Sequence, residues 1–209
     1  MNVDFKALAR DERADMADFL ATLSPREWDT ATLCQGWRVR DVVAHMISYE
    51  DLDAAGVLRR LAKGRLSLNR ANEVGLADYR DHTPEDLLAD LKGHLQPRGL
   101  TTWLGGRIAL LDAMVHHQDI RRPLGRPRDI SPERLCAALS MALVAPPIRG
   151  FWRARGLRLV ATDLDWRGGR GQLVSGPAES LLMAVAGRPG AVQQLDGPGQ
   201  PTLAARIRR

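Results

Sequence analysis

The sequence predicts a mainly α protein with a small α+β part at its C-terminal end. Apolar residues recur at helical spacing in several stretches between residue 5 and about residue 145, which is typical of amphipathic helices. From about Gly150 the pattern changes to alternation over residues 157–162, followed by a glycine-rich turn at 167–171, which indicates strands. We therefore expect two domains, a helical bundle over residues 1–148 and a small α+β domain over residues 149–209.

The first half of the bundle follows from apolar stripes and their breaks. A helix is expected over residues 5–23, and Pro25 ends it because proline disfavours a helical conformation in the residue before it. A second helix is expected from Val39 to about residue 61. Residues 64–82 are polar and poorly periodic, so they are expected to form a long connection in an up-and-down bundle.

The later elements are recognised by their start signals. Thr83, Pro84 and the acids that follow combine an N-cap, a first-turn proline and favourable charge, which predicts a third helix ending by residue 96. The remaining elements are expected over residues 102–122 and 131–145 (helices), 157–162 and 172–175 (a strand and its returning partner), and 178–186 and 201–207 (helices).

Composition excludes several classes of protein. The net charge is +5, but basic residues alternate with acidic ones and form no stripe with aromatic residues, so no nucleic-acid partner is expected. No apolar run reaches eighteen residues, and the first ten residues lack a signal-peptide layout, so we expect a cytoplasmic protein without a membrane span. Cys34 and Cys136 are expected to be reduced thiols.

A histidine and a carboxylate four residues apart form the candidate site. Asp112 and His116 share one face of the fourth helix, and His45 lies at the margin of the buried face of the second. Together they would make a two-histidine, one-carboxylate metal site inside a bundle. The alternative is a surface hydrogen bond and a core histidine with a backbone partner. His117 points about 100° away, so it is not expected to bind the same ion.

Three stretches resemble a known family. The stretch from Thr32 to Met46 contains a Cys-x-Gly-Trp-x-Val-Arg-Asp pattern followed by a histidine, and the stretch from Asp112 to Gly125 contains a His-His-Gln-Asp-Ile core. The tail from Asp163 to Pro198 adds further matches. These segments resemble the mycothiol-dependent maleylpyruvate isomerase family, part of the DinB-like superfamily. The resemblance implies a DinB-like four-helix bundle with a small C-terminal domain.

The resemblance also implies a ligand set and a chemistry. The family's metal ligands fall on His45, Asp112 and His116, with one departure, because the isomerase has Glu where this chain has Asp112. The implied cofactors are a divalent metal, expected to be Zn²⁺, and mycothiol as the thiol cosubstrate. The metal would activate the thiol for attack on a small-molecule electrophile, giving an isomerase or a thiol S-transferase that is a monomer or a homodimer.

Each of three further residues, Arg188, Asp119 and Cys34, has more than one possible role. The family directs an arginine of its C-terminal domain towards the active site, and Arg188 is the candidate catalytic residue; an exposed arginine in a turn is the alternative. Asp119 is a candidate acceptor that orients a ligand, or else a helix cap or surface residue, and Cys34 is expected to pack in its loop.

The rival functions are a non-catalytic metal- or ligand-binding bundle and a non-haem Fe(II) enzyme.

Overall fold

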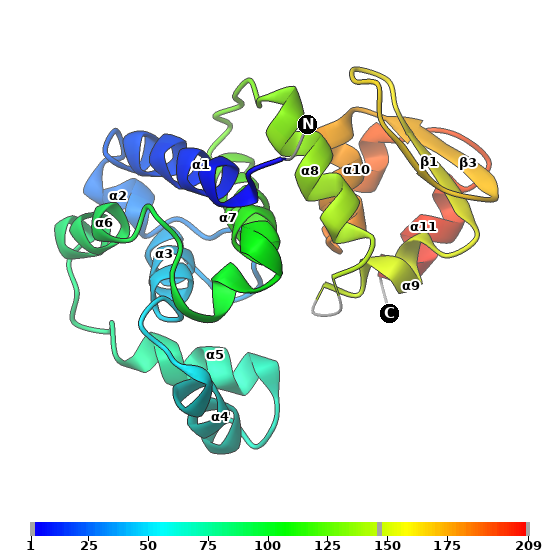
Figure 1. Ribbon diagram of the computed structural model, residues 1–209. Helices are drawn as coiled ribbons and strands as arrows, with labels where there is room; N and C mark the ends of the chain where they lie inside the picture. Colours follow the sequence, from blue (N-terminus) through cyan, green and yellow to red (C-terminus); the bar gives the residue numbers. More distant parts are fainter. Residues whose placement is uncertain (1–2, 146–147, 208–209) are drawn as a thin grey trace. The chain divides into compact units, whose positions relative to one another are not determined.

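The computed structural model describes residues 3–145 and 148–207 of the chain and divides into two compact units, Met1–Pro127 and Arg128–Arg209 (Figure 1). This division lies about twenty residues before the expected change at 148–149. The difference arises because helix α8 (Pro132–Ala142), expected in the bundle, packs on α10 (Ala178–Val185) of the second unit. The proline pair 146–147, expected to end the fifth helix, lies outside the described residues.

The first unit is helical and contains a four-helix bundle. Its elements are α1 (Phe5–Leu20), α2 (Pro25–Trp28), α3 (Val39–Ile47), α4 (Ala54–Lys63), α5 (Leu68–Ala77), α6 (Pro84–Gly93), the 3-10 helix η1 (Gly99–Gly106) and α7 (Arg107–Arg121). Helix α1 packs on α6 and α7, and α3 packs on the same two helices. These four helices therefore enclose the core, and the expected mainly α fold is confirmed.

Two expectations for the middle of this unit are wrong. The helix expected from Val39 to residue 61 is two helices, because α3 ends at Ile47 and Asp53 caps a new helix by accepting from the Gly56 amide at 2.6 Å. The expected connection 64–82 contains α5, which packs on α3 and α4. The buried residues of α5 are Ala71 and Gly75, which are too small to give an apolar stripe.

Helix α7 begins later than expected and lies deep in the unit. Gly105 and Gly106 have φ angles of 71° and 91° and interrupt the helix expected from residue 102. A Cβ at Gly106 would lie 3.0 Å from the Lys6 amide nitrogen, so this glycine also permits a close approach to α1. From Ala109 to Ile120 almost every residue of α7 is buried. Polar side chains on this helix therefore point into the protein interior.

The second unit is the small α+β part. Besides α8 and α10 it contains α9 (Gly150–Ala154), β1 (Leu157–Ala161), β2 (Arg167–Gly169), β3 (Gln172–Gly176), the 3-10 helix η3 (Pro189–Gln194) and α11 (Gln200–Ile207). The strand order is β2-β1-β3, with β2 antiparallel and β3 parallel to β1. The returning strand is thus β2, which was expected to be a turn, and the expected hairpin of β1 with β3 is wrong. Helix α10 covers β1 and β3.

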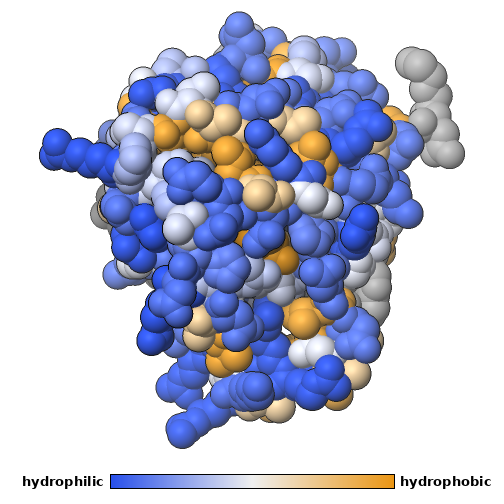
Figure 2. Space-filling view, turned by 90° about the vertical axis from the view of Figure 1, so that its left-hand side faces the viewer, coloured by the Kyte–Doolittle hydropathy of each residue, from blue (hydrophilic) through white to orange (hydrophobic). Residues whose placement is uncertain are grey.

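The face of the molecule in Figure 2 is mostly hydrophilic. Figure 2 shows one side of the molecule, on which hydrophobic residues gather in a few patches among hydrophilic ones. Exposed apolar side chains include Leu58, Leu66 and Leu68, on α4, α5 and the turn between them. None of the helices in the described ranges is long and apolar enough to cross a membrane.

Candidate metal centre

Helices α3 and α7 bring His45, Asp112 and His116 together. One potential ligand atom from each of these side chains lies within 4.8 Å of the other two. Asp112 Oδ1 is 3.5 Å from His116 Nε2, one helical turn away, and 3.9 Å from His45 Nε2 on α3. The Asp112 carboxylate therefore lies close to both imidazoles, although its side chain is one methylene shorter than the Glu of the isomerase. Its side chain is 29% exposed, so one side of the cluster faces solvent.

The three groups shift one another's pKa. Burial favours neutral forms, and it lowers the pKa of His45 despite the nearby Asp112. Burial also opposes charge on Asp112 and His116, but their mutual attraction outweighs it. The pKa of Asp112 is therefore far below its usual range, and the pKa of His116 is well above its usual value. A metal ion would have to displace a proton from His116.

The other nitrogen of His116 faces a second group. Asp119, whose side chain is fully buried, places Oδ2 3.0 Å from His116 Nδ1. The Cys34 thiol donates to the same carboxylate oxygen at 3.1 Å and lies 3.6 Å from Nδ1. These atoms form another group of potential ligands that shares His116. The two nitrogens of His116 thus have separate surroundings, Asp119 on one side and Asp112 on the other.

The loop between α2 and α3 supplies Cys34 and Trp37. Its turn is closed by the Thr32 amide, which donates to the Trp37 carbonyl at 2.9 Å, and Gly36 has a φ of 80°. The indole of Trp37 is tilted against the His45 ring, with the ring centroids 4.9 Å apart. The expectation that Cys34 packs in its loop is therefore too narrow, because the Cys34 thiol contacts His116 and the neighbouring Trp37 contacts His45.

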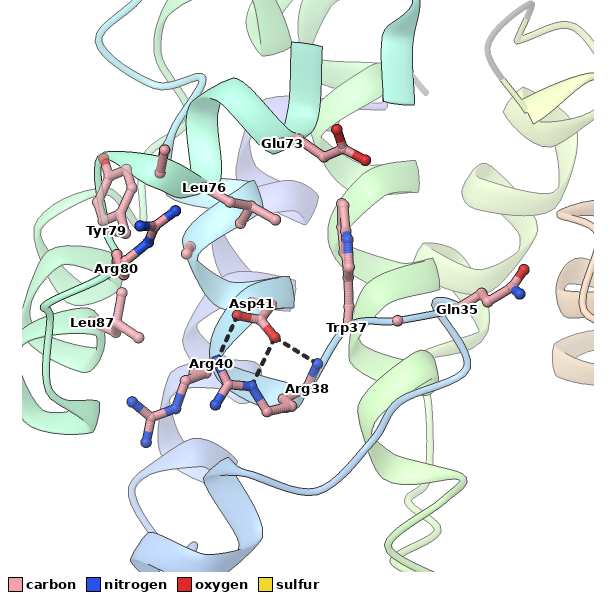
Figure 3. Close-up of a pocket in the computed structure, with 13 residues that line it drawn as sticks. Gln35, Trp37, Arg38, Arg40, Asp41, Glu73, Leu76, Tyr79, Arg80 and Leu87 are labelled. Carbon is pink, nitrogen blue, oxygen red and sulfur yellow. Dashed lines mark hydrogen bonds and ion pairs between the residues drawn. The ribbon is translucent and has the colours of Figure 1, made fainter. Parts of the chain in front are cut away.

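A pocket of about 400 Å³ lies beside this loop, and Trp37 forms part of its wall (Figure 3). Figure 3 shows Arg38 bonded to Asp41 at one end of the pocket. Arg40 lies 2.8 Å from Asp29, so both of these arginines have acidic partners. The other walls come from α5, the turn after it and α6, including Glu73, Leu76, Tyr79, Arg80 and Leu87. Trp37 is therefore common to the pocket and to the surroundings of His45.

His117 belongs to a different network, as its direction on the helix predicts. Its Nδ1 lies 3.0 Å from Oε1 of Glu12 on α1, and both side chains are fully buried. Arg121 Nε donates to His117 Nε2 at 2.7 Å. Since Nε2 accepts this bond, the ring proton is on Nδ1, and a neutral imidazole connects an acid to an arginine.

Tyr49 lies beside the candidate site, whereas Arg188 belongs to the second unit. Tyr49, one turn after His45, contacts its ring edge-on at a centroid distance of 5.6 Å and donates to Asn72 Oδ1 at 2.7 Å. The spacing of four residues from His45 is the sequence signal that could have identified it. Arg188 lies in the second unit, before η3, where it donates to the Ala186 carbonyl at 2.8 Å. Its role as a catalytic residue stays a prediction.

Comparison with known proteins identifies a family model and two solved structures that this chain resembles. Residues 9–98 match the family described as the mycothiol maleylpyruvate isomerase N-terminal domain; His45 lies inside this range and Asp112 and His116 beyond it. Two crystal structures, of mycothiol-dependent maleylpyruvate isomerase and of a histidine-to-alanine variant, each align with a TM-score of 0.60 at 18% identity, over 94% of this chain and 92% of theirs. At this identity the likeness establishes the fold alone. No curated protein shows significant sequence similarity to the chain.

Proposed function

We propose that the chain is a member of the mycothiol maleylpyruvate isomerase family, whose N-terminal domain matches residues 9–98, and that it is a mycothiol-dependent metalloenzyme acting on a small electrophile. The observation that carries the proposal is the convergence of His45, Asp112 and His116 from two helices of the bundle. The matched structures are of an isomerase, so isomerisation is one of the two reactions we consider; thiol transfer is the other.

The three residues fit a divalent ion. Ligands at about 2.0–2.2 Å from zinc are separated from one another by about 3.4 Å in a tetrahedral site, and Asp112 Oδ1 lies 3.5 and 3.9 Å from the two imidazole nitrogens. Two imidazoles and one carboxylate suit zinc or iron(II). A carboxylate on the far nitrogen of His116, here Asp119, is the usual partner of a metal-binding histidine.

The residues of the chain would hold and orient the reactants. Three protein ligands leave coordination positions open, as in catalytic rather than structural sites. When bound, the ion would make the sulfur of an external thiol nucleophilic by favouring its deprotonated form. Asp119 would keep the proton of His116 on Nδ1, so that Nε2 remains available to the ion. Trp37 and Tyr49 exclude water from two sides of the His45 ring.

The reaction depends on what happens after the thiol adds. Addition to a carbon–carbon double bond, rotation about the resulting single bond and elimination of the thiol would isomerise a cis double bond. Addition or displacement without elimination would be a thiol transfer. Arg188 is the proposed partner for a carboxylate of the substrate or the thiol, because a guanidinium binds carboxylates through two parallel hydrogen bonds.

The proposal is tested by metal analysis and thiol dependence. Protein purified without a metal-affinity tag should contain about one divalent ion per chain, and His45→Ala should lose it. His82→Ala is the matched control, since His82 is a partly exposed histidine near Asp90. Turnover of maleylpyruvate or a panel of electrophiles should require both mycothiol and the ion, and it should persist in Cys136→Ala.

Three outcomes would contradict the proposal in different ways. Stoichiometric metal in His45→Ala would refute the ligand assignment. Turnover that needs Fe(II) and dioxygen but no thiol would support the non-haem iron alternative. Metal binding without any effect of mycothiol across the panel would favour a non-catalytic metal-binding bundle.

A further inference from the structure

One oxygen of Asp119 receives two hydrogen bonds. The Cys34 thiol donates to Oδ2 at 3.1 Å, and His116 Nδ1 lies 3.0 Å from the same atom. The side chain of Asp119 is fully buried. A buried carboxylate is costly unless donors surround it, so both contacts stabilise its charged form in this position.

The thiol is itself held in place by its loop. The Cys34 amide donates to Thr32 Oγ1 at 3.2 Å, and the Leu33 amide donates to the backbone carbonyl of Asp119 at 3.1 Å. The segment that carries the thiol is thus bonded to the same residue of α7 that the thiol contacts. This double attachment fixes the distance between the loop and the end of α7.

We infer that Cys34 is a positioning residue of the metal centre, which acts through Asp119 on His116. Its thiol restrains rotation of the carboxylate, and the carboxylate keeps a proton on Nδ1 of His116. Nε2 then points towards His45 and Asp112. The inference rests on the proposed function in one respect, that His116 is a metal ligand. It assigns Cys34 neither as the nucleophile nor as a ligand.

The rival reading is that Cys34, Asp119 and the Nδ1 atom of His116 bind an ion themselves, since their donor atoms also lie close together. An ion bound there would displace the thiol proton of Cys34 and the Nδ1 proton of His116. Both hydrogen bonds to Asp119 Oδ2 would then be lost. The two readings therefore predict different effects when the thiol is replaced by a hydroxyl, which keeps the donor but is a poor ligand for zinc.

The test is the dissociation constant for Zn²⁺, measured by competition with a chromophoric chelator in the absence of thiol and substrate. Asp119→Asn should weaken binding by about 10- to 100-fold, as the loss of such partners does in other sites. Cys34→Ala should weaken it by about 3- to 10-fold, the effect of one hydrogen bond, and Cys34→Ser by less than about twofold. Cys136→Ala, which removes the other thiol, should leave it unchanged.

A double mutant separates positioning from general damage to the fold. If Cys34 acts through Asp119, Cys34→Ala should have little further effect in the Asp119→Asn background, because coupled residues are not additive. Equal effects in both backgrounds, or no effect of Cys34→Ala in the wild type, would overturn the inference. So would a sulfur-to-cobalt charge-transfer band in the Co²⁺ protein that disappears in Cys34→Ala, because it would make Cys34 a ligand.

A second readout does not need the metal. In the metal-free protein with ¹⁵N-labelled histidine, the Nδ1-bound proton of His116 should exchange faster with solvent in Cys34→Ala than in the wild type or Cys34→Ser. An unchanged exchange rate would show that the Cys34 thiol does not stabilise the hydrogen bond between His116 and Asp119. If the wild type binds metal and Cys34 has the expected effect but no thiol reaction is found, the catalytic proposal fails and this inference stands.

Discussion

Replacing His117 should damage the fold rather than the metal centre, although His117 is adjacent to the proposed ligand His116. His117 bridges Glu12 and Arg121 through contacts of 3.0 and 2.7 Å, and neither His117 nor Glu12 is exposed. His117→Ala removes both contacts and leaves the Glu12 carboxylate buried. The change should therefore lower the free energy of unfolding.

The size of the loss follows from these contacts. Hydrogen bonds that involve a charged partner contribute about 1.5–3 kcal/mol each, and the neutral imidazole of His117 makes two of them, one with Glu12 and one with Arg121. We therefore expect a loss of about 3–6 kcal/mol in His117→Ala, which corresponds to about 6–24 °C in the melting temperature for a chain of this size. His117→Gln, which keeps a polar side chain, should lose less.

The assay is urea unfolding followed by circular dichroism, with metal content measured on the folded fraction of each variant. His117→Ala should retain stoichiometric metal, whereas His116→Ala should lose it. His82→Ala should differ from the wild type by less than about 0.5 kcal/mol, as expected for a surface substitution. The reasoning would be refuted if His117→Ala unfolded within about 1 kcal/mol of the wild type, or if it lost the metal while folded.

Three further outcomes are expected. Apparent Zn²⁺ affinity should fall as the pH is lowered, because the raised pKa of His116 means that the ion displaces a proton; a titration series that is flat with pH would contradict this. Asp112→Asn should lower the pKa of His116 in the metal-free protein, since Asp112 is the strongest group opposing the effect of burial; an NMR titration with no shift would exclude that coupling. Gly171→Ala should destabilise the chain by about 1–3 kcal/mol, because Gly171 has a φ of 123° and its Cβ would clash with the Gly156 carbonyl. Gly190→Ala is the matched control, with no atom near its Cβ, and equal melting temperatures of the two variants would contradict the prediction.

The parts of the fold that could be predicted are those with strong local signals. Thr83 and Pro84 give the start of α6, and its capping box is present in the structure. The alternation over β1 is matched by buried Leu157 and Leu159 with exposed Arg158 between them. By contrast, β2 consists of Arg167, Gly168 and Gly169, which have no apolar pattern. Its place beside β1 is set by backbone pairing, which the sequence does not display.

The candidate site divides in the same way. The spacing of Asp112 and His116 on one helix is local, so the sequence shows it directly. His45 is a candidate third ligand from its place on another helix, and the family resemblance implies the same residue. Asp119 shares the helix and was recognised as a candidate partner. The contact of Cys34 with Asp119 spans 85 positions, and it depends on how a loop folds back on α7. No local pattern reports such a contact, and Cys34 was accordingly expected to be a packing residue.

The fluorescence of Trp37 can report the binding of a ligand or metal ion. Its indole contacts the ring of His45 on α3 and also forms part of the wall of the neighbouring pocket. Indole emission responds to nearby charge and to water. An ion bound beside His45, or a ligand bound in the pocket, should therefore change the fluorescence of this residue. The difference between the spectra of the wild type and Trp37→Phe isolates that signal from the other tryptophans. A search for ligands can thus begin by titration in a fluorimeter, before any reaction has been identified.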